Sequence, residues 1–131
     1  MVKTGRYLLD TNIVIALFAN EPDVQQRLAE ANEVFVPSIV VGELYYGVYK
    51  SARVEANLAR LDTFVAGNTI LPCDTVTARQ YGAIKNALRA KGRPIPENDI
   101  WIAAVAMQYH LTLVARDGHF QEVDGLVVEQ W

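Results

Sequence analysis

Four acidic residues of this 131-residue chain stand beside strongly apolar sequence, where predicted strands end or predicted helices begin. They are Asp10, Glu43, Asp99 and Asp117. Carboxylates gathered against an apolar core repel one another, so some of them must bind a proton or a cation. Hard oxygen ligands suit Mg²⁺ or Mn²⁺, which keep several waters and accept phosphate oxygens. A cation held there would activate water and stabilise negative charge at phosphorus.

Each acid also has an ordinary structural interpretation, because a carboxylate near a helix N-terminus commonly caps the helix or stabilises its dipole. For any single one of the four, that interpretation is as good as a metal site. It explains the convergence of all four much less well. We therefore predict a joint site.

Short apolar segments alternate with helical periodicity along the chain. Strands are predicted over residues 6–9, 34–36, 69–71, 111–115 and 126–128. Helices are predicted over residues 13–19, 23–31, 38–49, 54–66, 75–91 and 98–109. This alternation indicates crossover units, so the predicted fold class is α/β, with a central parallel sheet between two layers of helices. Ligands in such folds bind at the carboxyl ends of the strands, where the four acids fall.

Length and composition fit one globular domain over residues 1–131, with 51% hydrophobic and 21% charged residues. The lone Cys73 excludes a disulfide framework and a paired-cysteine zinc site, and it fits a cytoplasmic protein. No apolar run approaches the roughly 20 residues of a membrane span, so no membrane partner is expected. The net charge of −3 excludes a protein that coats nucleic acid nonspecifically.

Four sequence blocks between about Tyr7 and Val128 resemble the PIN domain family, and more narrowly the VapC-type toxin ribonucleases of toxin–antitoxin pairs. The blocks are Leu8-Leu9-Asp10-Thr11-Asn12, Pro37-Ser38 through Gly42-Glu43-Leu44, Asn98-Asp99 before Ile102-Ala103-Ala104, and Leu113-Val114-Ala115-Arg116-Asp117 with Phe120. Each block alone is a weak signal. Their order and spacing in a chain of this length are fairly specific.

The resemblance implies a three-layer α/β/α fold and a Mg²⁺- or Mn²⁺-dependent endoribonuclease, which hydrolyses RNA phosphodiester bonds with metal-activated water. The positions matching the family's catalytic, metal-binding quartet are Asp10, Glu43, Asp99 and Asp117. The positions matching supporting polar groups are Thr11, Asn12, Ser38 and Asn98. The resemblance also implies a homodimer and a cognate antitoxin whose tail lies in the active-site groove.

The chain departs from the family pattern at Ala115, where many members have Thr or Ser two residues before the last Asp. A hydroxyl that would support the site is therefore missing. Such supporting groups change metal affinity or activity by about 10–100-fold. The departure bears on metal affinity at Asp117.

Several basic residues are candidates for RNA binding. Lys85, Arg89, Lys91 and Arg93 form a run without acids that leads toward Asp99. A solvated helix face is the commoner explanation for such a run. Contacts of Arg89 and Arg93 with phosphate are the alternative, since phosphate contacts supply most of the affinity for nucleic acid. Arg116 either steadies phosphate or pairs with a nearby acid, and we favour the pairing.

Other residues leave alternatives open. His119 lies two residues after Asp117 and could approach the site, but the intervening turn favours a position that faces solvent. Tyr46 and Tyr49 would either stack on bases or form a dimer surface. One rival function is a phosphoacceptor receiver domain, but Asp10 lacks the paired acid that such domains need. The other rival is a catalytically weak PIN-like module that binds protein.

Overall fold

The computed structural model describes residues 2–131 and contains a five-stranded parallel sheet in the order β3-β2-β1-β4-β5. The strands are β1 (Thr4–Leu9), β2 (Ala31–Pro37), β3 (Thr69–Leu71), β4 (Thr112–Val114) and β5 (Val128–Glu129). The helices are α1 (Thr11–Phe18), α2 (Pro22–Glu30), α3 (Ser38–Tyr49), α4 (Val54–Ala66), α5 (Thr75–Ala90), α6 (Glu97–Gln108) and the 3₁₀ helix η1 (Gly118–Glu122).

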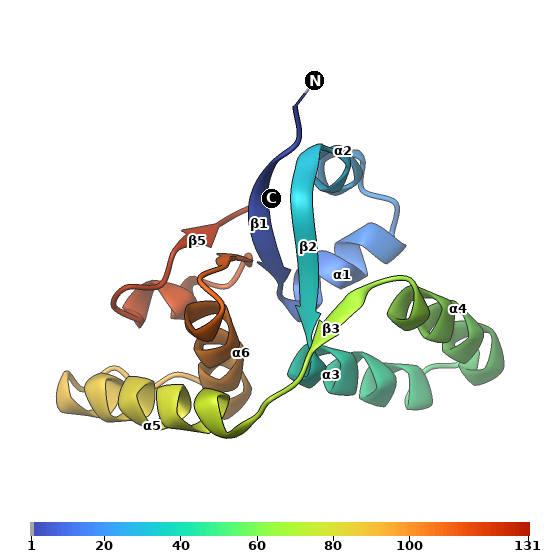
Figure 1. Cartoon of the computed structure of the whole chain (residues 1–131). Helices are drawn as coiled ribbons and strands as arrows, with labels where there is room; N and C mark the ends of the chain where they lie inside the picture. The colour runs from blue at the N-terminus through green and yellow to red at the C-terminus, as the bar shows by residue number, and fades with distance from the viewer. Residues whose placement is uncertain (1) are drawn as a thin grey trace.

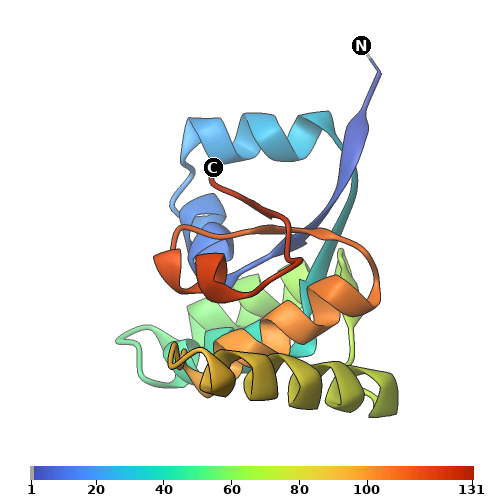
Figure 2. The same ribbon diagram turned by 90° about the vertical axis from the view of Figure 1, so that its left-hand side faces the viewer.

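The helices form two layers, one on each side of the sheet. Figure 1 shows α1 to α4 on one side and α5, α6 and η1 on the other. Figure 2 shows α2 and α5 at opposite ends of the molecule, with strands of the sheet between them. The predicted three-layer α/β/α fold with a central parallel sheet is confirmed.

The predicted elements are all present, and the differences lie mainly at their ends. The strand β1 begins at Thr4 because its polar first half pairs with β2, where Arg6 stands opposite Glu33 and forms an ion pair with it at 2.9 Å. The strand β4 covers only Thr112–Val114. The short helix η1 was not predicted, and it follows directly after Asp117.

The core covers both faces of the sheet and includes buried residues of α1, α3 and α4 on one side and of α6 on the other. Leu8 of β1 and Leu113 of β4 are fully buried. The helix α6 buries an unbroken segment, residues 102–106, of which three are alanines. Small side chains let α6 approach both the sheet and α5 closely, so this helix is held on all sides. Its N-terminal turn, which carries Asp99, is consequently held by the core.

The chain changes direction across the sheet at β1. From β1 it proceeds outward through β2 to β3, and the crossover through α5 and α6 then returns it to β4 on the other side of β1. Such a switch point leaves room for a ligand at the carboxyl ends of the strands. The order also differs from the 2-1-3-4-5 order of receiver domains, which excludes that rival. Within residues 2–131, no helix is both long and apolar enough to cross a membrane.

Candidate active site

Asp10 stands at the switch point, between the end of β1 and the start of α1. Its backbone N–H donates to the carbonyl of Val114 at 3.0 Å, which extends the β1–β4 pairing beyond Leu9. Its own carbonyl accepts from the N–H of Ile13 at 3.1 Å. The backbone of Asp10 therefore begins the helix, but its side chain makes no capping hydrogen bond. With only 6% of the residue exposed, Asp10 is buried, and its carboxyl group interacts with the backbone N–H of Thr11.

Glu43 and Asp99 reach the same edge from helices on opposite sides of the sheet. Glu43 lies in the second turn of α3, which begins immediately after β2. Asp99 lies in the first turn of α6, and no side chain caps that helix. Helix capping therefore does not explain Glu43 or Asp99.

Asp117 follows β4 and does cap a helix. Its Oδ1 accepts a hydrogen bond from the backbone N–H of His119 at 2.9 Å, at the start of η1. Asp99 lies in the first turn of α6, where a carboxylate stabilises the helix dipole, and a side-chain cap is observed for Asp117 alone among the four predicted acids. Even there, the cap leaves the second carboxylate oxygen free.

Burial and mutual repulsion raise the pKa values of three of these acids. Burial is the largest cause of the raised pKa of Asp10, which reaches about 6. The N–H of Thr11 opposes this shift, while the negative charges of the other three acids add to it. Burial also raises the pKa of Glu43 and of Asp99. The structure therefore brings all four predicted carboxylates within charge–charge range.

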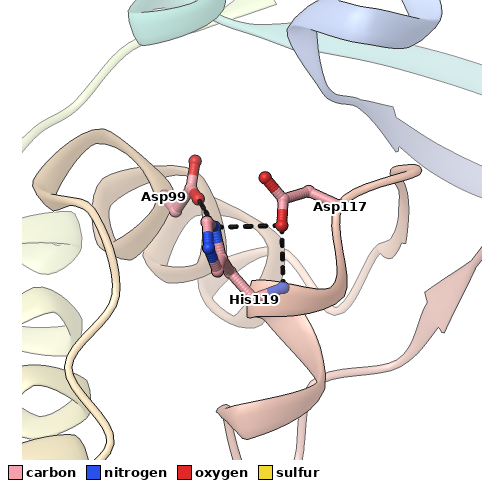
Figure 3. A group of neighbouring side chains, drawn as sticks. All are labelled: Asp99, Asp117 and His119. Carbon is pink, nitrogen blue, oxygen red and sulfur yellow. Dashed lines mark hydrogen bonds and ion pairs between the residues drawn. The ribbon is translucent and has the colours of Figure 1, made fainter.

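His119 contacts the site, which is the less favoured of its two predicted positions. Its Nδ1 atom lies 2.9 Å from Oδ1 of Asp117 and 3.2 Å from Oδ2 of Asp99, as Figure 3 shows. The side chain is still 49% exposed. The cause is η1, which turns the chain back toward α6 directly after Asp117. The only sequence signal for this turn is the Asp-Gly-His spacing, in which an Asp side chain bonds to the backbone two residues on.

The predicted supporting residues occupy different surroundings. The hydroxyl of Thr11 lies close enough to Glu43 to lower the pKa of that carboxyl. Ser38 faces Cys73. Burial raises the pKa of the Cys73 thiol, and a hydrogen bond with the hydroxyl of Ser38 partly offsets that rise. Asn98 lines a surface hollow that also contains Ser38 and Glu43. Asn12 is exposed on α1.

The side chain of Thr11 is the clearest indication that the site binds a group other than protein. Among residues 2–131, its Oγ1 is the buried side-chain polar atom that makes no hydrogen bond of standard geometry. A buried hydroxyl without a partner is costly, so such atoms normally have a water, ion or ligand beside them. The donor set around it is carboxylate and hydroxyl oxygen, which fits a hard divalent cation such as Mg²⁺ or Mn²⁺.

Ala115 is fully buried beneath the site, and its backbone N–H donates to the carbonyl of Glu129 at 3.1 Å. It supplies no polar group to Asp117. The imidazole of His119 is the polar side chain that contacts this carboxylate instead.

The predicted basic residues differ in what they contact. Arg89 and Arg93 are exposed, and neither forms an ion pair within residues 2–131. Arg89 lines a surface hollow whose other residues include Ile100, the neighbour of Asp99. Arg116 pairs with Glu21 at 2.8 Å, as favoured from the sequence.

A largely apolar groove adjoins the acids on the α1–α3–α4 side. Thr11 and Glu43 line the groove at the site end, and Leu44, Val48 and Leu61 contribute to its apolar part. Ile15 of α1 also lines it and is 51% exposed. The groove could receive an apolar side chain from another molecule beside the acidic site.

The chain is similar to a known protein family and to several known proteins. The model of the PIN domain family matches residues 7–126. The ribonuclease VapC2 of Haemophilus influenzae is 40% identical over 129 residues, which cover 96% of this chain and 98% of that protein. The tRNA(fMet)-specific endonuclease VapC of Shigella flexneri is 34% identical, with 96% of this chain and 98% of that protein covered.

The solved structures that resemble this chain include toxin–antitoxin complexes. One is the crystal structure of VapBC2 from Rickettsia felis bound to a DNA fragment from their promoter. Its matching chain has a TM-score of 0.88 and 33% sequence identity, over 95% of this chain and 98% of that chain. The likeness thus extends over nearly the whole fold.

Proposed function

This chain belongs to the PIN domain family, and we propose that it is a divalent-metal-dependent endoribonuclease, the toxin of a toxin–antitoxin pair. The observation that carries this proposal is the convergence of Asp10, Glu43, Asp99 and Asp117 at one edge of the sheet, where only Asp117 caps a helix. The ribonuclease and endonuclease names of relatives at 40% and 34% identity support it.

In this proposal the four acids form the catalytic centre. Asp10, Asp99, Asp117 and Glu43 would hold Mg²⁺ or Mn²⁺. When bound, such a cation lowers the pKa of water and stabilises negative charge at phosphorus. In the metal-free chain, burial raises the pKa of Glu43, and the negative charge of Asp99 adds to that rise. The hydroxyl of Thr11, on α1, lies beside the Glu43 carboxylate and opposes the rise in its pKa.

Two exposed arginines are candidates for guiding RNA to the site. We expect Arg89 and Arg93 to contact backbone phosphates, because they are exposed and Arg89 lies beside the hollow that reaches Ile100. A structured RNA is the substrate class to test first, since the Shigella flexneri relative is named as specific for tRNA(fMet).

The antitoxin is proposed to bind the groove beside the acids. An apolar groove with a polar end suits a segment that inserts aliphatic or aromatic side chains and presents a polar group to the site. The VapBC complexes among the similar structures support a protein partner. A homodimer also belongs to the proposal, with the exposed Tyr46 and Tyr49 of α3 as a candidate surface.

The direct test is cleavage of transfer RNA by the purified chain with Mg²⁺, with Mn²⁺ and with EDTA. Asp10→Asn and Asp99→Asn remove one site carboxylate each, while Asp23→Asn makes the same change on the exposed face of α2. We expect the wild type and Asp23→Asn to cleave only with metal, and both site variants to lose activity.

Two results would contradict the proposal. Cleavage that persists in both site variants would mean a contaminant or a different site. Tight binding of RNA or antitoxin without metal binding or cleavage would favour the catalytically weak, protein-binding module. A panel that includes ribosomal RNA guards against a narrow substrate preference.

A further inference from the structure

His119 places a nitrogen atom among the oxygen atoms of the acidic site. Its Nδ1 and one carboxylate oxygen each from Asp99 and Asp117 all lie within 4.8 Å of one another. Figure 3 shows the imidazole between the two carboxylates, on the first turn of η1. These three groups come from two separate segments, the start of α6 and the loop after β4.

The two distances from Nδ1 of His119 match those between neighbouring ligands of one metal ion. Neighbouring ligand atoms in an octahedron with bonds of about 2.1 Å lie about 3.0 Å apart. The Nδ1 atom lies 2.9 Å from Oδ1 of Asp117 and 3.2 Å from Oδ2 of Asp99. Small adjustments would therefore let all three atoms bind the same cation.

A purely structural role explains the imidazole less well. Oδ1 of Asp117 already accepts the backbone N–H of His119, which orients the carboxylate without the ring. Asp99 lies in the first turn of a helix that the core holds closely. The carboxylate of Asp117 is thus oriented without the ring, and the imidazole is placed to bind a cation together with both acids.

We propose that His119 is a nitrogen ligand of the cation bound by Asp99 and Asp117, and that it makes the site prefer Mn²⁺ to Mg²⁺. The inference rests on the proposed function, because it concerns the same metal centre. Mg²⁺ takes oxygen ligands almost entirely, whereas imidazole is a common ligand of transition metals. Replacing a water ligand with imidazole therefore favours the binding of Mn²⁺ over that of Mg²⁺.

The test is pulsed electron paramagnetic resonance of Mn²⁺ bound to the purified chain. Electron spin echo envelope modulation detects an imidazole nitrogen bonded directly to Mn²⁺. We expect this signal in the wild type and its loss in His119→Gln. His110→Gln is the matched control, since His110 is the other histidine of the chain and lies beyond the end of α6. Calorimetric titrations should show Mn²⁺ affinity falling about tenfold in His119→Gln, with Mg²⁺ affinity changed less than about twofold.

The outcomes separate this inference from the proposed function. Bound Mn²⁺ without a nitrogen signal in the wild type overturns the inference, whatever the variants do, and leaves the nuclease intact. A nitrogen signal in a chain that cleaves no RNA supports the inference and contradicts the nuclease. Failure of the wild type to bind Mn²⁺ overturns both. Equal losses of Mn²⁺ and Mg²⁺ affinity in His119→Gln, with circular dichroism unchanged, overturn the selectivity.

Discussion

The guanidinium of Arg116 donates to both carboxylate oxygens of Glu21, with N···O distances of 2.8 and 3.3 Å. Its Nε also donates to the backbone carbonyl of Trp131 at 3.0 Å. The hydrogen bond with Arg116 is the largest cause of the lowered pKa of Glu21. Because Arg116 immediately precedes Asp117, these bonds tie the loop that carries a site carboxylate to the start of α2 and to the last residue.

We therefore expect Arg116→Ala to slow cleavage several-fold through displacement of Asp117, with little change in RNA affinity. Single-turnover kinetics and filter binding measure the two quantities separately. Arg27→Ala is the matched control, because Arg27 also joins α2 to the C-terminal segment, by an ion pair with Glu129 at 3.3 Å, but is not adjacent to a site residue. Weakened RNA binding at an unchanged single-turnover rate would instead assign Arg116 to phosphate binding.

The double variant Arg89→Ala/Arg93→Ala should bind RNA more weakly and with a shallower salt dependence. For each phosphate that the protein no longer neutralises, the slope of log affinity against log salt falls by about 0.7–0.9. Titrations across a range of salt concentrations measure this slope. Arg53→Ala, at the exposed start of α4, should leave the slope unchanged. An unaltered slope in the double variant would reassign these arginines to a solvated helix face.

Removing the charge of Asp10 should stabilise the metal-free protein. A folded-state pKa of about 6, against 3.8 for an ordinary aspartate, corresponds to at most about 3 kcal/mol. Because the folded state binds this proton more tightly than the unfolded state, wild-type stability falls as the pH rises from about 4 through 6. Asp10→Asn does not lose stability in this way. The amount by which its free energy of unfolding exceeds that of the wild type should therefore be larger at about pH 8 than at about pH 5.

Urea unfolding in EDTA at the two pH values measures that difference, with Asp23→Asn as the control for an exposed aspartate. Added Mg²⁺ should narrow the gap at the higher pH, because a ligand that binds only the folded wild type stabilises it. A variant less stable than the wild type at both pH values would show that the carboxyl group makes contacts the fold requires.

The groove beside the acids yields a prediction about the antitoxin. Ile15→Gln replaces an exposed apolar groove residue with a polar one of similar size, and should weaken antitoxin binding about tenfold. Val76→Gln is the matched control, since Val76 is 57% exposed on α5, away from the groove. Calorimetry with the proposed antitoxin partner compares the two variants. Equal affinities would move the proposed antitoxin site elsewhere.

The sequence was sufficient to predict the fold and the positions of the four acids. Asp10 and Asp117 each follow an apolar strand, and parallel strands place their carboxyl ends at a common edge. Glu43 and Asp99 are near the start of helices with clear boundaries at Pro37 and Pro96. Each of these signals lies within a few neighbouring residues, so a single sequence is enough to detect it.

The position of His119 depends on less visible features. The five residues of η1 are too few to show a helical period, and their direction is set by the cap that Asp117 provides. The Arg116–Glu21 contact joins residues that are 95 positions apart, and the sequence indicated only that Arg116 would pair with some acid. Distant partners of this kind follow from the packing of whole elements rather than from local pattern.

The neighbours β1 and β4 are separated along the chain by six helices and two strands, yet Leu9 pairs with Val114. No stretch shorter than Asp10 to Asp117 contains the acidic site, and pairings between such distant segments form late in folding. During translation, the first three acids emerge from the ribosome before the strand that brings Asp117 beside Asp10. The proposed acidic site is therefore assembled only after the chain has been made through Asp117 and β4 has paired with β1.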